Sequence, residues 1–139
     1  VDGDGVDPVR EVDAASAAAD TPDAVVFNGV ANQYDARPLT ARVGERVRFW
    51  VLAAGPNRGT SFHVVGGQFD TVWSEGAYLL RPGPAGSVEG DAGSQVLGLA
   101  TAQGGFVELS LPEPGHYPFV DHVMAKAEKG AHGILRVTP

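Results

Sequence analysis

The 139-residue sequence predicts an all-β domain, an antiparallel sandwich or barrel, and three observations support this fold class. From Ala24 onward, short runs rich in β-branched and aromatic residues alternate with turns of Gly, Pro and Asn. Several runs alternate with period two, so that Val47, Phe49 and Val51 share one face of a strand. With 43% apolar residues, the chain can also bury a hydrophobic core of its own.

Eight strands, one short helix and one long loop make up the predicted domain. The strands are expected at residues 24–30, 39–43, 46–53, 61–66, 96–102, 105–111, 116–121 and 133–138. A short helix is expected near residues 123–129, because the run ends at Gly130. The stretch RPGPAGSVEGDAG, residues 81–93, is too rich in Pro and Gly for regular structure and is expected to form a surface loop.

Residues 1–23 differ in composition from the rest of the chain. They hold seven acidic residues against Arg10 alone, and almost no large apolar side chains. A short helix is favoured by propensity within VREVDAASAAA, residues 9–19, but the segment can bury little surface by itself. We therefore divide the chain into an acidic arm or interdomain linker, residues 1–23, and a β domain, residues 24–139.

Composition excludes several classes of function. The net charge is −7 and no basic cluster occurs, so nucleic acid is not an expected partner. No run approaches the roughly 20 apolar residues of a membrane span, so membrane insertion is not expected. The absence of cysteine rules out disulfides, thiolate metal sites and cysteine nucleophiles in this chain. Because the sequence begins at Val1 without Met or a signal peptide, we expect it to be a piece of a longer protein.

Four histidines are the residues best suited to metal or proton chemistry. His63 lies within an apolar strand and His122 at the end of another, where a polar ring needs a reason to be present. Three imidazoles suffice for a zinc or a type 2 copper site, but spacing alone does not select which rings converge. His116 and His132, each at the start of a strand, are expected to be structural or surface residues. A hydrogen-bonded or surface histidine is the plain alternative at every one of these positions.

Four stretches, in this order, carry a resemblance to a known family. They are VVFNG (25–29), VGERVRFWV (43–51), GPNRGTSFHVVGGQFDTVW (55–73) and PGHYPFVDHVMAKAEKGAHGILRV (114–137). Together they resemble the second, C-terminal cupredoxin domain of copper-containing nitrite reductases, which belong with the two-domain multicopper oxidases. The absence of a His-x-His pair favours the nitrite reductase type over laccase-like relatives.

The resemblance implies a Greek-key β-sandwich of cupredoxin type and a role for two histidines. His122, in FVDHVMAKA, matches the position at which the second domain supplies one type 2 copper ligand. His63, in SFHVVGG, matches the catalytic histidine that passes protons to the copper-bound substrate. Reduction of nitrite to nitric oxide consumes protons, which an imidazole can supply near neutral pH.

The resemblance also implies partners that this chain does not contain. In the family, the type 2 copper lies between the first cupredoxin domain of one subunit and the second domain of a neighbouring subunit in a homotrimer. The remaining copper ligands belong to the N-terminal domain, and a type 1 copper cannot form here without cysteine. The chain alone is therefore not expected to be a complete enzyme. A periplasmic, extracellular or cell-surface location follows from the resemblance alone.

Two other functions remain open at this point. The chain could be a non-catalytic cupredoxin-fold binding or assembly module, or a stand-alone copper-binding protein that combines His63 and His122 with a neighbour's histidine. The sequence does not choose among nitrite, dioxygen and a phenol as the small-molecule substrate.

Overall fold

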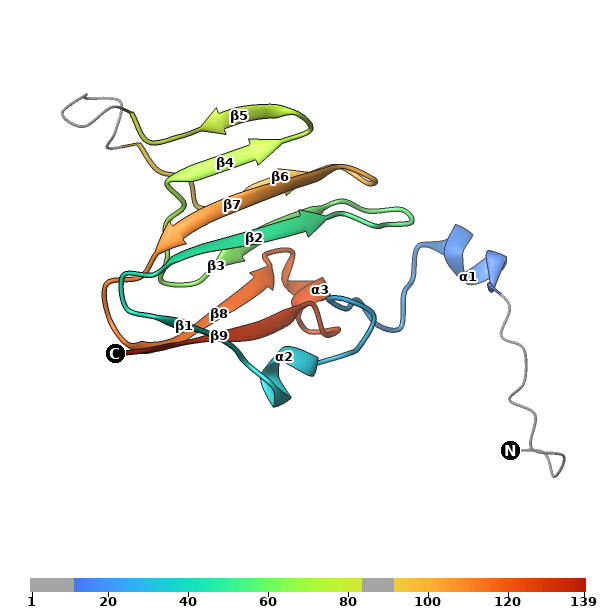
Figure 1. Cartoon of the computed structure of the whole chain (residues 1–139). Coiled ribbons are helices and arrows are strands. Elements are labelled where there is room, and N and C mark those ends of the chain that lie inside the picture. The colour runs from blue at the N-terminus through green and yellow to red at the C-terminus, as the bar shows by residue number, and fades with distance from the viewer. Residues whose placement is uncertain (1–11, 84–91) are drawn as a thin grey trace, which may run out of the picture.

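Two β-sheets packed face to face form the molecule in a computed structural model, which describes residues 12–83 and 92–139 (Figure 1). The strands are β1 Leu39–Arg42, β2 Arg46–Leu52, β3 Thr60–Val64, β4 Thr71–Ser74, β5 Ala77–Leu80, β6 Leu97–Leu99, β7 Gly104–Ser110, β8 Gly115–Asp121 and β9 His132–Thr138. The helices are α1 Ala14–Ala19, α2 Gln33–Ala36 and α3 Met124–Ala127. The prediction of an all-β sandwich with a short helix after residue 122 is confirmed.

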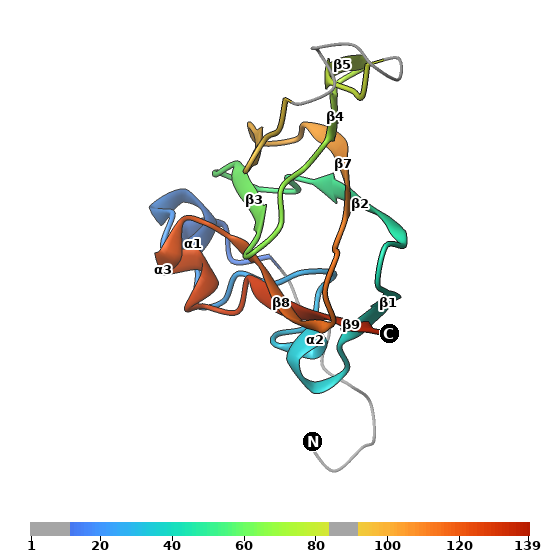
Figure 2. The same cartoon turned by 90° about the vertical axis from the view of Figure 1, so that its left-hand side faces the viewer.

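Strands that are consecutive in the sequence often belong to different sheets, so the chain crosses from one sheet to the other several times. One sheet has the order β1-β9-β8-β3-β6 and the other the order β2-β7-β4-β5. All pairings are antiparallel except that of β1 with β9. Figure 2 views the strands nearly end-on, with the two sheets as separate layers. Strands β3 and β8 are far apart in the sequence but are neighbours in the larger sheet.

The core between the layers consists of the inward side chains of both sheets. Phe119 lies at its centre, where its ring contacts those of Phe27, Phe49 and Phe62 at centroid distances of 5.5, 5.5 and 6.1 Å. The buried members of this cluster are Ala41, Ala53, Phe62, Val64, Phe69, Val72, Leu97, Leu99, Val107, Leu109, Leu111, Phe119, Leu135 and Val137. Such burial is worth about 1.5–3 kcal/mol for each large side chain, and it holds β3 and β8 rigidly against the opposite sheet.

Three features differ from the sequence-based expectations. Residues 24–30 do not form a strand, because Asn28 and Gly29 both have positive φ angles, of 54° and 80°, and turn the chain. The hairpin of β4 and β5 was not predicted, since its turn residues Glu75 and Gly76 lack an Asn-Gly or Asp-Gly signal. Helix α2 was also not predicted.

The N-terminal segment makes few contacts with the sandwich. Helix α1, which lies within the run expected to be helical, is capped by Asp13, whose side chain accepts hydrogen bonds from the backbone of Ala15 and Ser16. It lies beyond one end of the sheets (Figure 1). Residues 1–11 of the predicted acidic arm, and residues 84–91 of the predicted loop, are outside the described residues. In the part of the chain that is described, no helix has the length and apolar character needed to cross a membrane.

Candidate functional site

His63 is directed to the outer face of the larger sheet by the alternation of β3. Its neighbours Phe62 and Val64 are 3% and 0% exposed and face the core, so the His63 side chain points the opposite way. The residue opposite it on β8 is Val120. His63 is therefore held on a rigid strand that is paired on both sides, with β6 and with β8.

A hydrogen bond to a backbone carbonyl selects the tautomer of the His63 ring. Nδ1 of His63 lies 2.5 Å from the carbonyl oxygen of Gln95. A carbonyl oxygen only accepts hydrogen bonds, so Nδ1 must carry the proton in this contact. In the neutral ring, Nε2 is then the unprotonated nitrogen and is free to take up a proton.

His122 follows directly after the last residue of β8 and is exposed. Its backbone N–H donates to the carbonyl of Ser61 at 2.8 Å, which extends the β3–β8 pairing by one residue. No residue within 12–83 or 92–139 forms a hydrogen bond with the ring nitrogens of His122. The imidazole is thus positioned by the backbone and has a nitrogen available for a metal.

The two rings meet on the outer face of this sheet. Their centroids are 5.3 Å apart and their planes are inclined by 75°. This proximity follows from strand geometry, because residues two positions out of register on adjacent antiparallel strands are diagonal neighbours. Within the described residues, no group of three or more His, Cys, Asp or Glu side chains could hold a metal ion. Any metal at this place would need ligands from outside those residues.

An apolar surface borders the histidine pair. Val65 follows β3 and is 43% exposed, whereas Val123 and Met124, which follow His122, are 40% and 54% exposed. Exposed apolar side chains grouped at one place on a surface favour contact with another protein surface.

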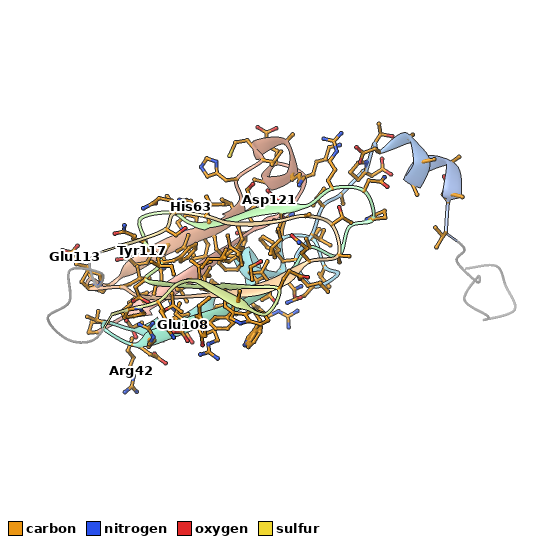
Figure 3. The ribbon with its side chains drawn as sticks, turned by 90° about the horizontal axis from the view of Figure 1, so that it is seen from above. Arg42, His63, Glu108, Glu113, Tyr117 and Asp121 are labelled. Atoms are coloured by element: carbon orange, nitrogen blue, oxygen red, sulfur yellow. The ribbon has the colours of Figure 1, made fainter. Side chains whose placement is uncertain are left out.

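A buried acid next to His122 is a feature that sequence reasoning missed. Asp121 is only 2% exposed, although acids near turns are usually solvated. Its carboxylate lies 3.1 Å from Nζ of Lys126 on α3. Figure 3 shows Asp121 and His63 on one side of the sandwich and Glu108 on the other. The Asp-His dipeptide followed by a lysine was the only signal of this pair in the sequence.

The other two histidines lie apart from the pair. His116 is exposed on β8. Nδ1 of His132, at the start of β9, lies 3.1 Å from the Oδ1 carboxylate oxygen of Asp35 on α2. His132 thus connects a helix to the sheet, in agreement with a structural role.

Comparison with known proteins gives a consistent set of relatives. No family model matches the chain. The copper-containing nitrite reductase of Neisseria gonorrhoeae is 36% identical over 135 residues, which cover 96% of this chain and 32% of that protein. The copper-containing nitrite reductase of Alcaligenes faecalis is 31% identical over 120 residues, covering 85% of this chain and 29% of that protein. The chain thus spans about a third of the length of the curated relatives it matches.

Solved structures agree with the sequence relatives. The copper nitrite reductase from Nitrosomonas europaea superposes with a TM-score of 0.75 at 28% identity, over 91% of this chain and 44% of that one. The copper-containing nitrite reductase from Thermus scotoductus gives a TM-score of 0.71 at 31% identity, over 83% of this chain and 25% of that one. A multicopper oxidase with a TM-score of 0.71 and 23% identity shares the fold, over 86% of this chain and 39% of that one.

Proposed function

Because this chain is homologous to one cupredoxin-like domain of the copper-containing nitrite reductases and related multicopper oxidases, we propose that it is the C-terminal domain of such an enzyme. In this proposal His122 supplies one type 2 copper ligand and His63 relays protons to the substrate. The reaction is the reduction of nitrite to nitric oxide.

The observation that carries the proposal is the pair of imidazoles on one sheet face. The rings lie 5.3 Å apart. The sequence resemblance implies that these two positions correspond to the family's copper-ligating and proton-transferring histidines. One ring has both nitrogens free of hydrogen bonds from described residues, and the other is held by the Gln95 carbonyl. A ligand and a proton carrier need these different surroundings.

The donor set fits part of a type 2 copper site. A neutral imidazole is a common copper ligand, and His122 is exposed and so open to an ion shared with another chain. No cysteine is present for the thiolate of a type 1 copper, so the electron would arrive from a centre elsewhere in the enzyme. The copper would hold nitrite and supply the electron to it.

The residues of this chain would then handle protons. Reduction of one nitrite to nitric oxide and water consumes one electron and two protons. Nε2 of His63 would take up a proton from solvent and donate it to a nitrite oxygen, and a second such transfer would supply the second proton, so that this oxygen leaves as water. The Gln95 carbonyl keeps the ring orientation fixed. The pairing of His63 with Val120 on β8, and of the preceding Phe62 with Leu97 on β6, limits the positional error of that transfer.

Partners complete the proposed site. The missing ligands would come from an N-terminal cupredoxin domain, and a ligand donated across a subunit boundary requires head-to-tail contacts that close into a ring, here a homotrimer. The exposed Val65, Val123 and Met124 beside the histidines support such a contact. We further propose that the enzyme acts outside the cytoplasm, in the periplasm or at the cell surface.

The test separates the two histidines in the natural full-length protein. We expect His122→Ala to lose the type 2 copper while any type 1 copper stays, because one of few strong ligands is removed. We expect His63→Asn to keep both coppers but to lower turnover by about 100-fold, with a larger loss at high pH, where other proton sources fail. Metal content by mass spectrometry, electron paramagnetic resonance and nitrite turnover against pH measure these effects, with His116→Ala as the control.

Three outcomes would contradict the proposal. Loss of copper in His63→Asn would instead make both rings ligands of one ion, as in a stand-alone copper protein. Copper-free full-length protein with no turnover would favour a non-catalytic binding module. Normal copper content and turnover in His122→Ala would remove the ligand role of this residue.

A further inference from the structure

At the end of β8, the two carboxylate oxygens of Asp121 together accept hydrogen bonds from four donors. Oδ1 accepts from the backbone N–H groups of Ser61 and Val123, at 3.2 and 3.1 Å. Oδ2 accepts from the hydroxyl of Thr60 at 3.0 Å and from Nζ of Lys126 at 3.1 Å. A carboxylate side chain that is 4% exposed and accepts from four donors is fully satisfied and has a fixed orientation.

These donors come from the segments that hold the histidine pair. Thr60 and Ser61 begin β3, the strand that carries His63, and Val123 directly follows His122. The hydrogen bonds of the Asp121 side chain therefore connect the turn that carries His122 to the start of β3. The backbone N–H of His122 adds one more hydrogen bond to β3, because it donates to the carbonyl of Ser61.

Lys126 holds the carboxylate from the helix that follows. Its side chain is 13% exposed, and its ammonium also donates to the carbonyl of Gly59. Removing one partner of a buried ion pair is strongly destabilising, so Lys126 stabilises the Asp121 side chain in this position. The pair thereby links α3 to the start of β3.

We propose that Asp121, held by Lys126, is a positioning residue that sets the spacing and orientation of His122 relative to His63. It touches neither substrate nor metal in this assignment, and it acts through the turn that carries His122. The expected effect of Asp121 on copper affinity rests on the proposed ligand role of His122. Its expected effect on the relative position of the two imidazole rings does not.

Two double variants separate the acceptor oxygen from the ion pair. Asp121→Asn with Lys126→Met keeps an amide oxygen for the N–H groups of Ser61 and Val123 but removes both charges. Asp121→Leu with Lys126→Met removes the charges and the acceptor together, and an apolar pair of similar volume is commonly tolerated in place of a buried ion pair. Val72→Ala, in the core of the other sheet, is the control for a general loss of stability.

The first measurement needs no metal. Nuclear Overhauser contacts between the ring protons of His63 and His122 should persist in the Asn/Met variant and in Val72→Ala, and be lost in the Leu/Met variant. The second uses copper titration of the full-length protein, with the type 2 electron paramagnetic resonance signal as readout. Copper affinity should fall by about 10–100-fold in the Leu/Met variant and by no more than a few-fold in the Asn/Met variant.

The outcomes distinguish this proposal from that of the previous subsection. Unchanged ring contacts in the Leu/Met variant would overturn the positioning role, as would equal losses in both double variants or failure of the Leu/Met variant alone to fold. If the unsubstituted protein binds no copper through His122, the ligand role fails, and the ring contacts still decide the positioning role.

Discussion

At the scale of single residues, Glu108 is a buried carboxylate that forms ion pairs with two arginines, Arg46 and Arg48. It lies on β7, 9% exposed, and accepts hydrogen bonds from Nε of Arg46 at 2.9 Å and from Nε of Arg48 at 2.6 Å. Burial of the carboxylate opposes its ionisation, but the hydrogen bonds and charges of the two arginines outweigh it and lower the pKa of Glu108. Asp70, together with Glu108, raises the pKa of Arg46 above its usual value.

Glu108 should therefore make stability depend on acid pH. Since its pKa is lower in the folded than in the unfolded state, its contribution is complete above the unfolded pKa, about 4.3, and is lost as the pH falls through the folded pKa. We expect Glu108→Gln to cost about 1 kcal/mol near neutral pH, a modest figure because both arginines are more than a third exposed. The cost should decrease as the pH falls below the unfolded pKa and through the lowered folded pKa of Glu108.

Urea unfolding of both proteins across this pH range measures the difference. Glu45→Gln, on the turn after β1, is the control for loss of one acid charge. A cost that stays constant with pH would show that Glu108 contributes through packing and not through its charge.

At the scale of elements, the contact between α2 and β9 depends on a residue without a side chain. A Cβ on Gly133 would lie 2.5 Å from Cζ of Phe119 and 2.5 Å from Cβ of Tyr34. Phe119 is 3% exposed and surrounded by other rings, so it has little room to move. Helix α2 therefore packs against β9 through Tyr34 only because this position is glycine.

Gly133→Ala should accordingly destabilise the fold by about 1–3 kcal/mol through overpacking. The matched control is Gly98→Ala on β6, where a Cβ would meet nothing within 4 Å. We expect that control to be neutral or stabilising by less than about 1 kcal/mol, because it reduces the entropy of the unfolded chain. Thermal unfolding of both variants compares them, and equal effects would mean that the contact at Gly133 relaxes freely.

At the scale of the whole molecule, the N-terminal segment contacts the sandwich through exposed groups. Asp20 pairs with Arg58 at 2.5 Å, with side chains 33% and 62% exposed. Asn57 donates to the carbonyl of Ala17 at 2.5 Å. No residue of α1 is buried. These contacts add little to the core that the two sheets form.

Deletion of residues 1–20 should therefore lower the free energy of unfolding by no more than about 1 kcal/mol, the usual limit for an exposed ion pair. The variant Arg58→Ala, which removes the ion pair alone, should reproduce most of that change. Urea unfolding followed by circular dichroism is the measurement. A loss of several kcal/mol on deletion would contradict the division of the chain at residue 23.

The sequence predicted the parts of the fold whose pattern is local. Period-two alternation in β2 placed Val47, Phe49 and Val51 on one face, and all three pack against the core. Both β2 and β7 lie within one residue of the expected bounds. The prediction of a strand at residues 24–30 was wrong. The β-branched residues of this run precede a turn at Asn28 and Gly29, and composition alone does not reveal the positive φ angles of these two residues. Backbone conformation at such turns depends on packing as well as propensity.

The residues of the candidate site could be singled out from the sequence, but not their arrangement. His63 and His122 stood out because polar rings in apolar strands need a reason, but their 5.3 Å separation depends on the pairing of β3 with β8. That pairing joins residues about 60 positions apart, which no local pattern encodes. The role of Asp121 escaped sequence reasoning for the same reason, since its donors lie on β3 and α3.

Three aromatic residues on the smaller sheet, Trp50, Trp73 and Phe106, form a cluster that gives the molecule a fluorescent reporter. Both tryptophans of the chain belong to it: Trp50 and Trp73 lie 6.1 Å apart, and each contacts Phe106. The histidine pair lies on the other sheet, so fluorescence emission reports on a face remote from it. Variants at His63 or His122 should leave the emission spectrum unchanged while the fold is intact. A protein surface that covers Trp50, now 67% exposed, should shift its emission to shorter wavelength.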